Sequence, residues 1–129
     1  MRYFQASEFA CPCGRCDGGA GRMSPALLER LDAAREAAGL PFVINSGYRC
    51  PDHNRAVGGV ADSAHTRGYA VDIRCVSSHD RFAMLQALLE VGFRRIELAP
   101  TWLHVDCDPG KPRDVAFYPA ASSAPKGGA

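Results

Sequence analysis

The sequence lacks an excess of charge of either sign. Its 129 residues carry 15 Lys and Arg against 14 Asp and Glu, a formal net charge of +1. A protein that binds nucleic acid through its phosphates needs a basic excess, so this balance disfavours a dedicated DNA- or RNA-binding protein. We therefore predict no nucleic-acid partner.

Long hydrophobic runs are also missing. No apolar stretch approaches the roughly 20 residues that cross a bilayer, so the sequence predicts no membrane span. The first ten residues include Arg2 and Glu8 and lack the apolar core of a secretory signal peptide. We expect a chain without a signal peptide, and no heptad pattern or long apolar edge argues against a monomer.

Internal repeats are absent, and the composition is ordinary, with 47% hydrophobic and 22% charged residues. These values disfavour disordered, collagen-like and coiled-coil proteins. The length fits one domain, which we place at residues 1–118. The low-complexity stretch 119–129 is expected to be a disordered tail.

The apolar spacing predicts two long helices. One starts at Pro25 after the capping residue Ser24 and ends at about Ala38, before Gly39. The other is predicted to be capped by Ser78 and to stop at Gly92. Its predicted apolar face consists of Phe82, Leu85, Leu88 and Leu89.

Short apolar runs predict strands at 41–45, 70–74, 93–98 and 102–107, with one or two helical turns after Pro51. Helices and strands are mixed without a repeated strand–helix–strand unit. This pattern favours an α+β fold.

Six cysteines are many for a chain of this length. Three lie within Cys11-Pro-Cys13-Gly-Arg-Cys16, and the others are Cys50, Cys75 and Cys107. A structural metal with Cys50 or His53 as its fourth ligand is one interpretation. Disulfides are another, with fifteen complete pairings that the sequence cannot separate. Free, buried thiols are the third.

The segment 45–72 is long, polar and rich in glycine, and a loop of this length inside a small domain is often functional. It contains His65 and Asp72, and His104 lies on a later predicted strand. Two imidazoles and a carboxylate suit a zinc ion with one open position. From spacing alone, the alternative is that both histidines are structural.

Five linked motifs then become recognisable in order. They are Ser46-Gly-Tyr-Arg49, His53-Asn54, Val57-Gly-Gly59, Ser63-Ala-His65-Thr-Arg-Gly68-Tyr-Ala70-Val-Asp72 and His104-Val-Asp106. Together they resemble the M15 family of zinc peptidases, and most closely its D-alanyl-D-alanine carboxypeptidase branch. The resemblance covers about residues 9–109.

The resemblance implies a fold shared with these peptidases and with the hedgehog signalling domain, a small antiparallel sheet with helices on one side. It implies zinc on His65, Asp72 and His104. It also implies that Arg49 contacts the substrate, a role that suits a permanently charged guanidinium. Ser46 is expected to support the loop that carries Arg49 and to contribute to substrate binding.

The chain departs from the family pattern at the general base. Several members have Glu or Asp three residues before the last zinc histidine, where this chain has Thr101, and another branch has His two residues before it, where this chain has Trp102. Asp106 is the candidate catalytic carboxylate, with a role in orienting a ligand histidine as its alternative. Glu97 is the other candidate base.

The resemblance therefore implies a zinc metallopeptidase acting on D-amino-acid-containing peptides of bacterial cell wall. Its substrate would be a peptidoglycan stem peptide, cut as by a carboxypeptidase or as by an endopeptidase of the phage endolysin type. Such a protein would stay cytoplasmic until released onto the wall. The alternative is a weak or inactive metal-binding module of the same fold that binds cell-wall peptide.

Overall fold

The computed structural model describes residues 1–119. The predicted tail at 119–129 lies, apart from Pro119, outside the described residues. The elements in chain order are η1 (Ala6–Phe9), η2 (Ala20–Arg22), α1 (Pro25–Ala38), β1 (Ile44–Ser46), α2 (Pro51–Ala56), η3 (Ala64–Arg67), β2 (Ala70–Arg74), α3 (Ser78–Glu90), β3 (Arg95–Leu98), β4 (Trp102–Asp106) and β5 (Val115–Phe117).

The strands form one five-stranded sheet in the order β1-β2-β4-β3-β5. The first four strands in this order pair antiparallel, whereas β5 pairs parallel with β3. The predicted α+β class is confirmed, but the sheet is mixed rather than wholly antiparallel. The sequence analysis predicted no strand at β5, which has only three residues and a central alanine.

Strict alternation along β2 and β4 gives the sheet two unlike faces. Val71 and Ile73 on β2 pair with Val105 and Leu103 on β4, and all four side chains are fully buried. The residues between them point to the opposite face, where Asp72 pairs with His104. One face therefore builds the core and the other carries polar chemistry.

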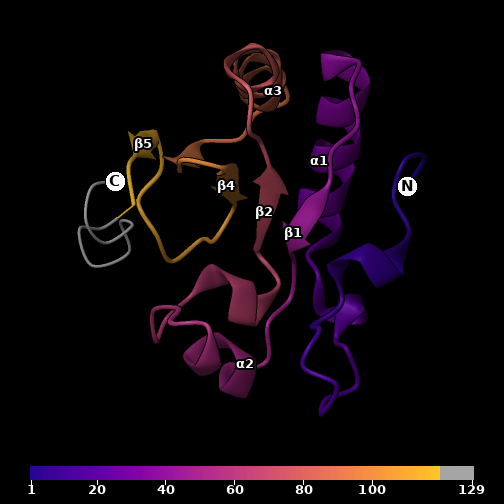
Figure 1. The fold of residues 1–129 in the computed structure, drawn as a ribbon, viewed down its shortest axis with the longest axis vertical. Helices are drawn as coiled ribbons and strands as arrows, with labels where there is room; N and C mark the ends of the chain where they lie inside the picture. Colours follow the sequence, from indigo (N-terminus) through magenta and orange to yellow (C-terminus); the bar gives the residue numbers. More distant parts are fainter. Residues whose placement is uncertain (120–129) are drawn as a thin grey trace.

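Helices α1 and α3 pack against each other and share one hydrophobic core with the apolar sheet face (Figure 1). The predicted start and end of α1 are confirmed. The Ser24 side chain accepts a hydrogen bond from Leu27 N, and Gly39 ends the helix in the left-handed conformation that glycine favours.

The predicted apolar face of α3 was wrong in part. Phe82 is 73% exposed and Leu89 is 56% exposed, whereas Met84, Ala87 and Leu88 are buried. The helix is rotated so that the stripe containing Met84 faces α1 and the shared core. Hydrophobic residues occur all around this helix, so the apolar pattern that included Phe82 did not specify which face is buried.

The predicted strand at 41–45 begins later than expected. Phe42 is buried in the core, but Val43 is 54% exposed, and regular pairing starts at Ile44. Pro41 lacks a backbone N–H and cannot extend the ladder. The predicted helical turns after Pro51 are confirmed as α2.

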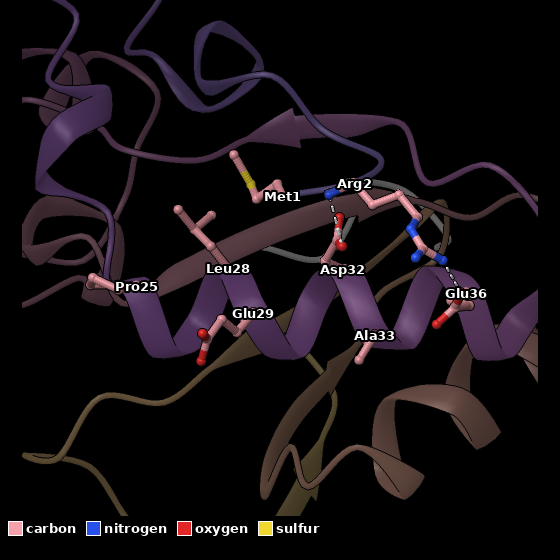
Figure 2. Close-up of a pocket in the computed structure, with 8 residues that line it drawn as sticks. All are labelled: Met1, Arg2, Pro25, Leu28, Glu29, Asp32, Ala33 and Glu36. Carbon is pink, nitrogen blue, oxygen red and sulfur yellow. Dashed lines mark hydrogen bonds and ion pairs between the residues drawn. The ribbon is translucent and has the colours of Figure 1, made fainter.

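The N-terminal segment lies against α1, where it forms a surface pocket with the helix (Figure 2). The backbone N–H of Arg2 donates to Asp32 at 3.0 Å, and the Arg2 guanidinium pairs with Glu36 at 2.6 Å. None of the predicted site residues lines this pocket. Among residues 1–119, no helix has the length and apolar character needed to cross a bilayer.

Candidate metal centre

The three predicted metal ligands converge on the polar side of the sheet. His65 comes from η3, Asp72 from β2 and His104 from β4, and one ligand atom of each lies within 4.8 Å of the others. Asp72 Oδ1 lies 3.2 Å from His65 Nε2 and 2.9 Å from His104 Nδ1. Two of the ligands are held by direct cross-strand pairing.

The short helix η3 delivers His65 to this centre. Ser63 caps it by accepting a hydrogen bond from His65 N, and Gly68 ends it at a φ of 78°. A side chain at Gly68 would also lie only 1.9 Å from the carbonyl oxygen of Arg22. Glycine is therefore required at this turn, for both its backbone conformation and the close approach.

Hydrogen bonds select which imidazole nitrogen faces the centre. His65 Nδ1 lies 2.8 Å from the carbonyl oxygen of Gly47, so it donates there and leaves Nε2 as an electron-pair donor. His104 Nε2 lies 2.7 Å from Asp106 Oδ2, which leaves Nδ1 facing Asp72. Such partners orient metal-binding histidines. The resulting set of two nitrogens and one carboxylate oxygen suits zinc with an open fourth position.

The electrostatics of the centre keep the carboxylate charged. Burial opposes ionisation of Asp72, but the neighbouring imidazoles of His104 and His65 outweigh it and hold the pKa of Asp72 well below the usual range. Burial alone would lower the pKa of His104, but Asp106 and Asp72 outweigh it and raise that pKa to about 9. The raised pKa favours the imidazolium form of His104 in metal-free protein, in which each ring nitrogen donates to one of the two carboxylates.

Arg49 lies at the edge of the centre and is held by three partners. Its Nε donates to Ser46 Oγ at 3.0 Å, one terminal nitrogen to Asn54 Oδ1 at 3.2 Å, and the other to Asp72 Oδ2 at 3.1 Å. A guanidinium has five N–H donors, so two remain for a ligand. Asp72 therefore links Arg49 to the two histidines through its two oxygens.

Asp106 lies behind His104 in a buried position. It is 2% exposed, and its Oδ2 also accepts a hydrogen bond from Arg95 Nε at 3.2 Å. Its Oδ1 accepts from the backbone N–H of Asp108 at 3.4 Å. These contacts match the orienting role that the sequence analysis weighed against a catalytic one.

Glu97 stands directly opposite His104 in the register of β3 and β4, on the polar face of the sheet. Its burial raises the pKa of its carboxyl, the nearby His104 opposes that shift, and Asp72 adds to it. A carboxylate with a raised pKa beside a metal centre is suited to accept a proton.

The two positions where relatives have a base lie just before and at the start of β4, and the two remaining histidines lie on α2 and α3. Thr101 is exposed in the turn before β4, and Trp102 is half-buried at the start of that strand. His53 lies on α2, where its backbone N–H donates to Cys50 Sγ at 3.4 Å. His79 is exposed on α3.

Three contributors to the site were not predicted from the sequence. Arg95 fixes Asp106, Asn54 fixes Arg49, and the Gly47 carbonyl fixes His65. Arg95 had a usable signal, because it lies two residues before Glu97 on one strand and so shares its face. The other two depend on the path of the loop between β1 and β2, which local patterns do not specify.

Comparison with known proteins supports the same interpretation. The family model described as Peptidase M15 matches residues 2–108, which include every residue of this centre. A search of curated proteins returned no match. Peptidases of this family depend on a metal, and this chain has groups that could bind one. Because the match covers most of the chain, the protein belongs to the peptidase M15 family.

Proposed function

We propose that this protein is a zinc-dependent peptidase that hydrolyses D-amino-acid-containing peptides of bacterial cell wall. It would act as a D-Ala-D-Ala carboxypeptidase or as a peptidoglycan endopeptidase. The observation that carries the proposal is the convergence of His65, Asp72 and His104 beside Arg49. The five motifs quoted above support the substrate class.

Bound zinc would supply a Lewis acid that polarises a peptide carbonyl and lowers the pKa of a water molecule. His65 Nε2, Asp72 Oδ1 and His104 Nδ1 are the atoms that would hold it. Arg49 has two N–H donors left after its three protein contacts. These donors would bind either the developing negative charge on the carbonyl oxygen or the terminal carboxylate of the peptide.

Ser46 acts in this account by positioning Arg49. Its Oγ accepts the Nε hydrogen of the guanidinium, which aims both terminal nitrogens toward Asn54 and Asp72. A fixed planar fork loses little freedom when a carboxylate binds to it. Ser46 thus contributes to substrate binding through Arg49.

Glu97 is the group that we assign to accept the proton from the attacking water. It faces the centre across the β3–β4 pair, and its raised pKa favours proton transfer. Asp106 as the base is the alternative. Its Oδ2 already contacts His104 and Arg95, which favours an orienting role.

A catalytically weak module that binds cell-wall peptide is the second candidate function. The observation that favours it is Thr101, which stands where several relatives have a carboxylate and cannot act as a base at neutral pH. The peptidase requires that Glu97 acts as the general base in place of that carboxylate, whereas the binding module does not.

The test uses the zinc-loaded protein with two kinds of substrate. A peptide ending in D-Ala-D-Ala reports carboxypeptidase activity by release of D-Ala, and purified peptidoglycan reports endopeptidase activity by release of new amino groups. The matched control is the same peptide ending in L-Ala-L-Ala. Hydrolysis of a D-amino-acid-containing substrate that is lost in Glu97→Gln would support the peptidase. Tight binding of the substrate without any hydrolysis would instead support the peptide-binding module.

A further inference from the structure

Four cysteines that the metal centre does not use form a second cluster. Cys11, Cys13 and Cys16 lie in the N-terminal loop, and Cys50 caps α2. One sulfur from each lies within 4.8 Å of the other three, although Cys50 is 34 positions beyond its nearest partner in the chain. The fold therefore brings together thiols from two separate loops.

The spacing of the sulfurs matches metal ligands rather than disulfides. The Sγ atoms of Cys13 and Cys16 are 3.5 Å apart, and those of Cys13 and Cys50 are 3.8 Å apart. All the cysteines are free. A disulfide needs a sulfur–sulfur distance of about 2.05 Å. A tetrahedron with zinc–sulfur bonds of about 2.3 Å has edges of about 3.8 Å.

Each of the four sulfurs accepts a backbone N–H. Arg15 N donates to Cys13 Sγ and Gly18 N to Cys16 Sγ, each at 3.3 Å. His53 N donates to Cys50 Sγ at 3.4 Å, and Cys50 N donates to Cys11 Sγ, also at 3.4 Å. Hydrogen bonds from N–H groups stabilise thiolates, which are the metal-binding form of cysteine.

We propose that Cys11, Cys13, Cys16 and Cys50 bind one structural zinc ion in a four-sulfur site. Four thiolates complete the tetrahedral coordination of zinc and leave no open position, which is the arrangement of structural rather than catalytic sites. The site is separate from the centre on the sheet and shares no ligand with it.

A surface pocket gives the ion a route to these ligands. It is lined by Cys13, Cys16 and Cys50 together with His53 and neighbouring residues. Three of the four cysteines therefore border a surface pocket, whereas Cys11 is buried.

The second zinc would act by fixing the loop that carries Arg49. Cys50 directly follows Arg49 in the chain, and Tyr48 N donates to the Phe9 carbonyl at 2.9 Å. Gly47 is packed so closely on Phe9 that a Cβ would lie 2.7 Å from the Phe9 carbonyl oxygen. The Gly47 carbonyl in the same loop also orients His65, so zinc at the cysteine site would hold both Arg49 and His65 in position.

The test measures zinc in His104→Ala protein, so that the sheet centre cannot contribute. After purification under reducing conditions without chelator, elemental analysis should give one zinc per chain. Adding Cys13→Ser should remove that zinc, whereas Cys107→Ser, at a free cysteine outside the cluster, should retain it. This readout is independent of any peptidase activity.

A second measurement covers the case in which Cys13→Ser does not fold. An organic mercurial that binds thiolates is titrated into folded His104→Ala protein, with a zinc-sensitive dye present. The proposal expects release of one zinc as the cysteines react, and intense thiolate-to-metal absorption when cobalt replaces zinc. Iron in place of zinc, a disulfide among these four cysteines, or zinc-free protein that takes up no zinc would overturn it.

Discussion

The sheet centre and the cysteine cluster are both groups of residues that could bind a metal, but they are built in opposite ways. Asp72 and His104 sit on adjacent strands, so their relative position follows from sheet pairing. The cysteine ligands come from loops, where the backbone wraps around each sulfur and donates N–H bonds to it. The rigid site has three ligands and the loop site has four.

The number of ligands fits the role that we propose for each site, catalytic for the sheet centre and structural for the cysteine cluster. Three mixed nitrogen and oxygen ligands leave a position for substrate or water, whereas four thiolates close the coordination sphere. The segment 47–50 joins the two regions, because the Gly47 carbonyl orients His65 and Cys50 belongs to the cluster. Variants in each region should therefore separate the two roles.

The largest expected effect comes from removing a ligand of the sheet centre. His104→Ala deletes the nitrogen that pairs with Asp72, so we expect loss of one zinc and of all measurable hydrolysis. Elemental analysis and a peptide-release assay measure both. His79→Ala, an exposed histidine on α3, is the matched control and should change neither. Retained hydrolysis in metal-free His104→Ala protein would contradict the assignment.

The next effect distinguishes the two carboxylates beside His104. Glu97→Gln should lower kcat by about 10²-fold or more while zinc stays bound, since a general base contributes about that much. Asp106→Asn should instead weaken zinc binding by about 10- to 100-fold, because it removes an orienting partner of a ligand. The measurement compares kcat and zinc affinity in Glu97→Gln and in Asp106→Asn. The opposite pattern would assign the base to Asp106.

A smaller effect should link the two regions. Cys50→Ser opens the cluster and frees the loop next to Arg49, and a modest misplacement of a substrate-binding group can cost up to about 10²-fold. We expect kcat/KM to fall while zinc at the sheet centre remains. Cys107→Ser is the control and should leave kcat/KM unchanged. Equal kinetics for both variants would show that the regions act independently.

The smallest effect concerns pH. The raised pKa of His104, about 9, means that metal must displace a proton at neutral pH. Zinc affinity of the sheet centre should therefore fall as the pH drops below about 9. In metal-free protein the stability changes with pH in the opposite direction, so that it falls as the pH rises. The stabilisation from protonated His104 is complete below its ordinary pKa of 6.5 and is lost as the pH rises through about 9.

Calorimetry in buffers of different ionisation enthalpy measures the released proton, and thermal melts of metal-free protein across this range measure the stability. His53→Gln is a suitable control, since His53 lies outside the sheet centre. A zinc affinity that stays constant from pH 6 to pH 9 would contradict the predicted competition.

The ligands of the sheet centre were predicted from the resemblance of the motifs, because spacing alone left structural histidines as the alternative. Gly68 marked the turn after His65, and the pairing of β2 with β4 explains why Asp72 lies opposite His104. The start and end of α1 followed from Ser24, Pro25 and Gly39.

What sequence could not give depends on long-range packing. The rotation of α3 is set by its packing against α1 in the shared core, so Phe82 is exposed although it was predicted on the apolar face. β5 pairs with β3 only because the chain returns to that edge. The sequence left Cys50 and His53 as alternatives for the fourth member of the cysteine cluster. Choosing Cys50 required knowing that its loop folds back onto the N-terminal segment.

The most direct test of two metal centres with different roles is anomalous diffraction at the zinc edge from crystals of zinc-loaded protein. We predict two peaks, one among His65 Nε2, Asp72 Oδ1 and His104 Nδ1, and one among the four sulfurs of Cys11, Cys13, Cys16 and Cys50. The first should show a non-protein ligand and the second none. A crystal of protein saturated with zinc that lacks either peak would contradict the account.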